Sequence, residues 1–223
     1  MGGEPLPEDF KWMLSVEDFK ERTRMDLDPE AEFIIPLRNV PKIKRMEDMK
    51  QCYLEALLRT VPTNDKKHIP FQNAEFQYYE WNPSNIRAPQ TFVQIDKLVN
   101  LLDLTTTGIF ADYGYTGFTR LTPKVVYSEI NETLYAALYV PPIIEQHDGD
   151  YLLLDGVHRS SLVRGTGGSM RYIVIKDVNV EFPTTPRPWE DVQKVQYKPP
   201  MEERYENLKP ELFRDLKYVG IDG

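Results

Sequence analysis

The sequence predicts an α+β fold built on a mixed sheet with flanking helices, and three neighbouring signals lead to this class. An apolar run at residues 151–154 passes through an Asp-Gly turn into a short helical pattern that ends near residue 165. The segment His-Asp-Gly-Asp at 147–150 is a hairpin signal that precedes this run. Residues 170–176, which are rich in β-branched side chains, predict a strand that follows it. Hairpin, strand, turn, helix and strand form one compact unit.

Residues 1–70 are expected to form an N-terminal helical extension. Residues 8–24 carry apolar side chains among charges, a pattern that fits one helix or two short ones. Residues 46–60 carry apolar side chains at three- and four-residue steps, which predicts a second helix that Pro62 ends. Residues 33–37 between them are typical of a short strand.

A strand, a turn and a helix are predicted next, at 75–81, 82–85 and 92–102. Two charged residues near this turn are candidates for function. Glu80 is a candidate catalytic carboxylate at the end of the strand, and Arg87 is a candidate contact for phosphate or substrate. Each can also be an ordinary surface residue.

The remaining segments carry less specific signals. Residues 105–120 interleave three glycines with aromatic residues, which fits a mobile lid over a substrate or a plain aromatic hairpin. Residues 124–139 are expected to form a helix or a pair of strands. After the proline-rich exit at 181–188, a helix is expected at 210–217.

The segment Asp-Gly-Val-His-Arg at 155–159, called the DGVHR turn below, is the main candidate site. A helix N-terminus presents unpaired N–H groups and the positive end of the helix dipole, which suits an anion. Arg159 can bind phosphate oxygens bidentately, and His158 can donate to phosphate or stabilise charge during phosphoryl transfer. Asp155 can cap the helix, shape the turn or coordinate Mg²⁺. The other candidate phosphate contacts are Gly156, Val157, Ser160 and Ser161.

These residues resemble the ParB/sulfiredoxin superfamily, which includes partition proteins, ParB-like nucleases, sulfiredoxins and free serine kinases. The resemblance rests on PPII, LLDGVHR, a short helix, a glycine and a closing strand within 137–180, with a weaker match at 75–102. It implies a ParB/sulfiredoxin-like sheet whose signature holds nucleotide phosphates. Sulfiredoxins carry a cysteine where this chain has Val157, and partition proteins carry Glu-Arg-Arg where it has Val-His-Arg.

The resemblance implies a nucleotide-phosphate-binding enzyme, either a small-molecule kinase or a nucleotide hydrolase. Its ligands would be ATP, ADP or CTP with Mg²⁺ and, for a kinase, a small-molecule acceptor. In free serine kinases the first block supplies a catalytic glutamate, and Glu80 is the nearest candidate here. Two other functions stay open, namely a ParB-like DNA-binding protein or nuclease, and a non-catalytic interaction protein.

Composition narrows these functions. The formal net charge is −8, and acidic residues outnumber basic ones in every quarter of the chain, whereas proteins that bind nucleic acid usually have a basic face. The single cysteine, Cys52, excludes an internal disulfide, and no apolar run approaches the about 20 residues of a membrane span. We expect a cytoplasmic protein with a helical extension (1–70), a ParB/sulfiredoxin-like domain (71–182) and a charged tail (183–223).

Overall fold

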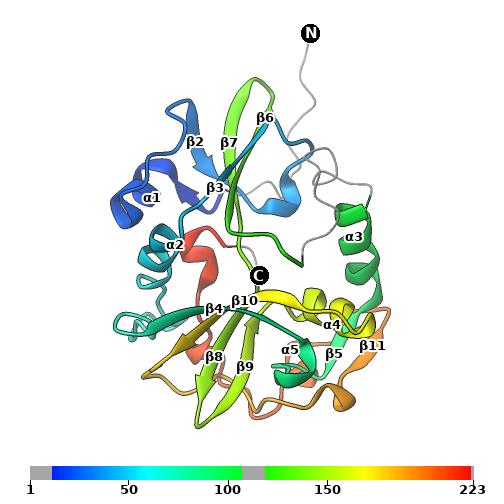
Figure 1. The fold of residues 1–223 in the computed structure, drawn as a ribbon. Helices are drawn as coiled ribbons and strands as arrows, with labels where there is room; N and C mark the ends of the chain where they lie inside the picture. The colour runs from blue at the N-terminus through cyan, green and yellow to red at the C-terminus, as the bar shows by residue number, and fades with distance from the viewer. Residues whose placement is uncertain (1–11, 107–118, 222–223) are drawn as a thin grey trace. The chain divides into compact units, whose positions relative to one another are not determined.

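The computed structural model describes residues 12–106 and 119–221 and has an α+β fold with mixed sheets, as the sequence predicts (Figure 1). The described residues form two compact units, and each unit draws on separate stretches of the chain. One unit takes residues up to 61, residues 122–140 and residues from 215 onward; the other takes 62–121 and 141–214. This division differs from the boundaries expected near residues 70 and 182.

The first unit is built on a five-stranded sheet with the order β1-β2-β7-β6-β3. β2 runs parallel to β7, and the other neighbouring strands are antiparallel. The strands are β1 (Leu14–Ser15), β2 (Ala31–Ile34), β3 (Arg45–Asp48), β6 (Lys124–Ile130) and β7 (Thr133–Tyr139). The helices are α1 (Val16–Thr23) and α2 (Gln51–Leu58), with the 3-10 turns η1 (Leu37–Asn39) and η6 (Leu216–Val219).

Residues 124–139, for which the sequence allowed a helix or a pair of strands, form the two strands of the hairpin β6–β7. Its two-residue tip, Asn131 and Glu132, has φ of 49° and 66°, and a tight hairpin of the type I′ kind needs positive φ at both positions. Residues Val125 to Tyr127 are at most 1% exposed. The hairpin therefore forms the centre of the first sheet.

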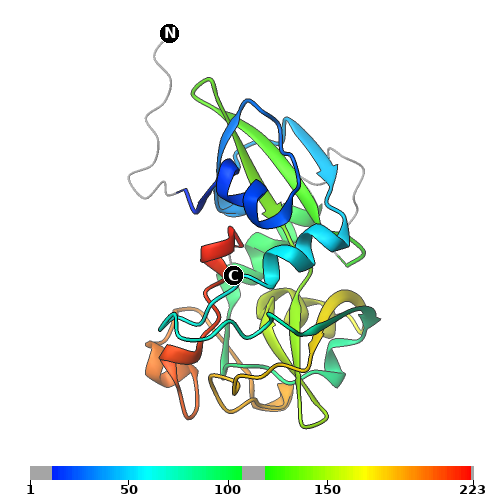
Figure 2. The ribbon, with the colours of Figure 1, turned by 90° about the vertical axis from the view of Figure 1, so that its left-hand side faces the viewer.

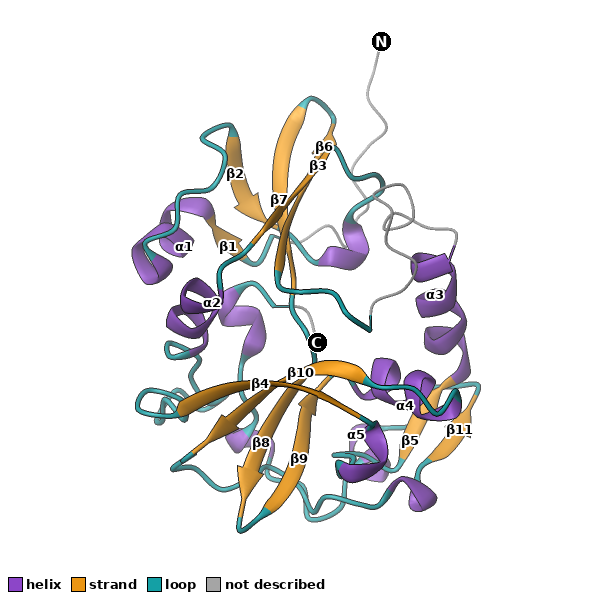
Figure 3. Ribbon diagram, in the orientation of Figure 1, coloured by secondary structure: helices purple, strands orange, loops and turns teal. Residues whose placement is uncertain are grey.

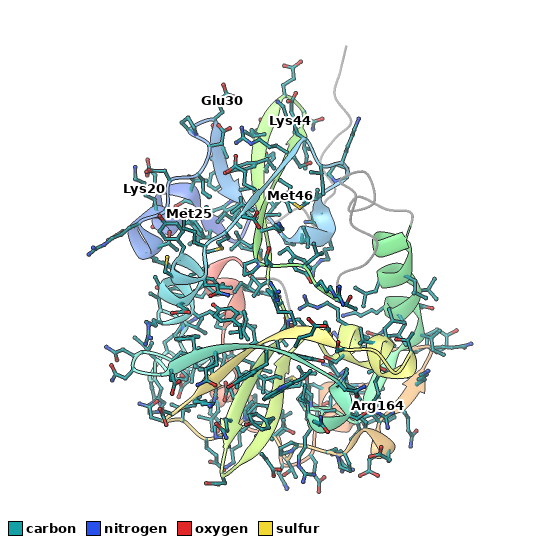
Figure 4. All side chains as sticks on the ribbon, viewed as in Figure 1. Lys20, Met25, Glu30, Lys44, Met46 and Arg164 are labelled. Atoms are coloured by element: carbon teal, nitrogen blue, oxygen red, sulfur yellow. The ribbon has the colours of Figure 1, made fainter. Side chains whose placement is uncertain are left out.

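The expected N-terminal helical extension is wrong for the described residues, because residues 12–61 contribute strands as well as helices to the first unit. Residues 45–48 form β3 and pair with 124–127 of β6, so Met46 lies on a strand and not on a helix (Figure 4). Pairing with β6 satisfies the backbone polar groups of this segment, and helical side-chain spacing cannot reveal such a distant partner. α1 begins at Val16 because the Ser15 hydroxyl accepts a 3.0 Å bond from the Asp18 N–H.

The second unit is built on a four-stranded sheet with the order β4-β10-β8-β9. β10 is parallel to β8 and antiparallel to β4, and β8 forms a hairpin with β9. The strands are β4 (Glu75–Trp81), β8 (Ile143–His147), β9 (Asp150–Asp155) and β10 (Met170–Lys176), and a separate parallel pair comprises β5 (Phe92–Gln94) and β11 (Gln193–Val195). The helices are α3 (Ile95–Thr106), α4 (Val157–Gly165) and α5 (Met201–Arg204), with the 3-10 turns η2 (Pro83–Asn85), η4 (Trp189–Asp191) and η5 (Pro210–Leu212).

The strands predicted at 75–81 and 170–176 are confirmed with these bounds, and they are β4 and β10. The hairpin signal at 147–150 is confirmed as well, because Asp148 and Gly149 have φ of 50° and 89° at the tip of β8–β9. The hairpin tip points away from α4 (Figure 2). The helix expected at 92–102 begins only at Ile95, since residues 92–94 pair with β11.

A buried ion pair fixes the end of the second unit to its sheet. Arg214 donates to both carboxylate oxygens of Glu145 on β8, over 2.8 and 2.7 Å, and both side chains are fully buried. The Arg214 guanidinium also donates to the backbone carbonyls of Val180, Glu181 and Leu212. The expected helix at 210–217 is replaced by the separate turns η5 and η6, and Arg214 lies between them.

Helices in the described ranges lack the combination of length and apolar character that crossing a membrane requires.

Candidate functional site

The DGVHR turn joins β9 to α4 through Gly156, a position that no other residue type fits without strain. Gly156 has φ of 89°, and a Cβ at this position would lie 2.6 Å from Cβ of Pro142. Proline cannot move its ring aside, so both backbone conformation and packing require glycine here. The glycine therefore serves the turn against Pro142, and the N-terminus of α4 receives no hydrogen bond from a capping side chain.

Asp155 and Arg159 form an ion pair across the turn. Nη2 of Arg159 donates to Oδ2 of Asp155 over 2.7 Å, and the two side chains are 15% and 8% exposed. Nη2 of Arg159 also lies 3.2 Å from the position that a Cβ of Gly156 would take. Asp155 thus holds the guanidinium against the first turn of α4, where the positive end of the helix dipole adds to its charge.

His158 connects α4 to the beginning of α3. Its Nε2 accepts a 3.2 Å hydrogen bond from the backbone N–H of Gln94, the residue just before α3. Burial lowers the pKa of His158 to about 4, and the nearby charges of Lys97 and Lys198 act in the same direction. The imidazole is therefore neutral at neutral pH, with its proton on Nδ1 because Nε2 is the acceptor.

Two helix N-termini and two lysine side chains lie close to His158, and Arg159 follows it on α4. α3 and α4 both begin here, and β5 and β11 lie beside them at one end of the four-stranded sheet (Figure 3). Lys97 lies in the first turn of α3, and Lys198 and Lys97 are close enough to His158 to lower its pKa. Arg159 on α4 is paired with Asp155, and Asp96 shares the first turn of α3 with Lys97, so acidic groups accompany these cations.

Ser160, a candidate phosphate contact, faces the sheet. Its side chain is fully buried, and its hydroxyl accepts a 3.1 Å bond from the Tyr172 hydroxyl on β10. Burial raises the pKa of Tyr172. Ser160 therefore joins α4 to the sheet, whereas Val157 and Ser161 are half-buried on the first turns of α4.

Glu80 and Arg87 are not brought to the DGVHR turn. β4, which carries Glu80, and β9, which ends at Asp155, are the two outer strands of the sheet, and the Glu80 carboxylate accepts a 2.8 Å bond from Ser169. Arg87 pairs through its Nε with Asp150, over 3.1 Å, at the other end of β9. Asp150 and Asp155 are about 16 Å apart at about 3.3 Å per residue of strand.

Asp155, the candidate Mg²⁺ ligand, is engaged by Arg159 in this structure. Its carboxylate is 8% exposed and is held by the guanidinium of Arg159. In the ranges that the structure describes, no group of three or more acidic, histidine or cysteine side chains could hold a metal ion. Because Mg²⁺ is commonly held by one or two carboxylates together with substrate phosphates, a role for Asp155 beside bound phosphates stays a prediction.

Sequence reasoning missed Lys97, Lys198 and the Gln94 backbone. The two lysines lie 61 and 40 residues away from His158 in the chain, so no motif links them to the turn. Residues 105–120, interpreted above as a lid or an aromatic hairpin, fall almost entirely outside the described residues.

Family models, curated proteins and solved structures were all compared with this chain, and none matches it significantly.

The pKa of His158 predicts how stability depends on pH. The folded-state pKa lies below the usual 6.5, so the neutral imidazole contributes stability fully above pH 6.5, and this contribution is lost as pH falls from 6.5 towards 4. The loss is up to about 3 kcal/mol. We expect wild type to lose more unfolding free energy between pH 7 and pH 4 than His158→Gln, whose amide oxygen can still accept from Gln94 but does not titrate. Urea unfolding of both proteins between pH 7 and pH 4 measures this difference. The same pH dependence of the unfolding free energy in both would contradict the prediction.

Proposed function

We propose that this chain is a nucleotide-phosphate-binding enzyme of the ParB/sulfiredoxin-like type, with its phosphate site at the DGVHR turn. The observation that carries the proposal is the convergence of the N-termini of α3 and α4 with Arg159, Lys97 and Lys198. N–H groups at a helix start and fixed cations are the groups that bind phosphate oxygens in proteins.

The order of elements in the second unit supports the family part of the proposal. β4 and α3 come first, then the hairpin β8–β9, the DGVHR turn, α4 and the closing strand β10. This is the order that the resemblance implies, with the hairpin β6–β7 of the first unit inserted between α3 and β8. The helix N-termini and the cations near the DGVHR turn are consistent with the phosphate site that the resemblance implies.

The reaction class we propose is phosphoryl transfer or nucleotide hydrolysis. Arg159, held by Asp155, would bind phosphate oxygens and stabilise the charge that develops on them. His158 would act as a neutral hydrogen-bond donor through Nδ1, because Nε2 is occupied by the Gln94 N–H and the low pKa keeps the ring uncharged. His158 is therefore not proposed as a general base.

Titration calorimetry of ATP, ADP and CTP against wild type, Arg159→Ala and Lys20→Gln tests the proposal. We expect wild type to bind at least one nucleotide and Arg159→Ala to lose about tenfold to a hundredfold in affinity, because a charge-assisted hydrogen bond contributes about 1.5–3 kcal/mol. Lys20→Gln removes the same charge from a side chain of α1 that is 62% exposed and that pairs with Asp26 in the first unit, so its affinity should equal that of wild type.

Equal affinity of Arg159→Ala and wild type would overturn the proposed site. Absence of binding to any nucleotide, together with salt-sensitive binding to DNA, would favour the DNA-binding function instead. Release of inorganic phosphate or ADP in steady state, measured beside the calorimetry, separates an enzyme from a protein that only binds nucleotide.

A further inference from the structure

A second concave site lies in the second unit, at the end of β9 opposite the DGVHR turn. A pocket of about 280 Å³ opens between η2, the tip of the hairpin β8–β9 and η4. Its charged and aromatic lining comprises Arg87, Asp150, Tyr151, Trp189 and Glu190. This volume lies just under the about 300 Å³ at which pockets for drug-sized ligands begin, so the pocket suits a smaller molecule.

Arg87 presents a fixed guanidinium at this pocket. Its backbone N–H donates to the Tyr151 carbonyl over 2.8 Å, and its carbonyl accepts from the Leu153 N–H over 3.0 Å, which fixes the residue along β9. Only Nε of the side chain is used, in the bond to Asp150. Within the described part of the chain its two terminal nitrogens have no hydrogen-bond partner, so they can donate side by side to a carboxylate.

The opposite charge is present in the same pocket. Asp150 uses one carboxylate oxygen for Arg87, and Glu190 uses one for Arg164, over 2.6 Å (Figure 4 labels Arg164). The second oxygen of each carboxylate has no recorded partner among the described residues, and Glu190 is 71% exposed on its side chain. These two oxygens can accept from an ammonium group.

Two aromatic residues of the lining are held in place by contacts of their own. Trp189 is 5% exposed, and its indole N–H donates to the Pro83 carbonyl over 2.8 Å. The Tyr151 ring packs edge-on against Trp81, with centroids 4.6 Å apart. At the rim, a Cβ added to Gly149 would meet no atom within 4 Å, so the tip of the hairpin leaves the opening clear.

We propose that this pocket binds a free α-amino acid. A guanidinium with free donors and two carboxylates with free acceptors match the carboxylate and the ammonium of one such molecule, and the mainly polar exposed lining suits a small polar side chain. The two acidic lining residues disfavour a nucleotide or another polyanion, and Arg87 disfavours a simple cation. The site is about 16 Å along β9 from Asp155 and does not depend on the proposed phosphate site.

Calorimetry or ligand-detected NMR with the proteinogenic L-amino acids at millimolar concentration tests the proposal, with L-asparagine and L-glutamine as the first probes because the exposed lining is mainly polar. We expect at least one to bind wild type. Its analogue without the carboxylate and its analogue without the ammonium should each bind at least tenfold more weakly, because each lacks one charge partner.

The variants Arg87→Met and Glu190→Gln should each weaken binding at least tenfold. Lys209→Met, which breaks an exposed ion pair with Glu181 elsewhere in this unit, is the matched control and should bind as wild type does. Glu190→Gln changes an exposed side chain and leaves folding intact. It therefore still tests the amino-acid pocket if the Arg87→Met variant does not fold. Lack of binding by every amino acid, or unchanged affinity in Glu190→Gln, would overturn the proposal.

Discussion

Replacing Glu145 by Gln is expected to lower the unfolding free energy by about 3–5 kcal/mol, because it leaves the Arg214 charge buried without a counter-ion. Both side chains are fully buried, and the pair is bidentate at 2.8 and 2.7 Å. Urea unfolding followed by tryptophan fluorescence measures the change, since Trp81 and Trp189 both belong to the second unit. Urea is preferred to guanidinium chloride because it does not screen charges.

Glu181→Gln is the matched control for this prediction. Glu181 pairs with Lys209 over 2.5 Å, but the two side chains are 67% and 40% exposed. A surface pair of this kind contributes about 0–1 kcal/mol. If both variants lost the same small amount, the buried pair would not be a main support of the second unit.

Replacing Gly156 by Ala is expected to cost about 2–4 kcal/mol, and replacing Gly149 by Ala only about 1–2 kcal/mol. Both glycines have φ of 89°, so the left-handed backbone penalises alanine equally at the two positions. The difference arises because a Cβ at Gly156 would lie 2.6 Å from Pro142, whereas a Cβ at Gly149 would meet nothing within 4 Å. The pair of variants therefore separates packing against Pro142 from backbone strain.

Urea midpoints of the two alanine variants, recorded under the same conditions, check this difference. Equal losses would mean that the loop carrying Pro142 moves away at little cost. A larger loss in Gly149→Ala would contradict the packing argument altogether. Because Gly156 lies in the proposed phosphate site and Gly149 lines the amino-acid pocket, the calorimetric titrations above should use neither variant as a control.

Local signals predicted the elements of the second unit well. The bounds of β4 and β10 follow from runs of aromatic and β-branched residues, and the tip of β8–β9 follows from Asp-Gly, which accepts positive φ. The predictions were wrong where a segment pairs with a strand that is distant in the sequence. β3 and β5 replaced parts of predicted helices because β6 and β11 supply their hydrogen bonds.

The candidate site was predicted only in part. The motif indicated the DGVHR turn, and the i, i+4 spacing of Asp155 and Arg159 permits the ion pair that forms. The same motif could not show that Ser160 faces Tyr172, that Asp155 is engaged by Arg159, or that Arg87 pairs with Asp150 at the far end of β9. Each of these depends on which neighbour covers the side chain.

The sequence by itself determined the α+β class, the strand, turn and helix around Gly156, and the single-cysteine, acidic character of the chain. These are set by residues within a few positions of one another, through periodicity and permitted φ. Only the tertiary structure decided the neutral state of His158, its bond to Gln94, the approach of Lys97 and Lys198, and the Arg87 pocket. Burial and electrostatic proximity arise from contacts between distant segments, which no local pattern encodes.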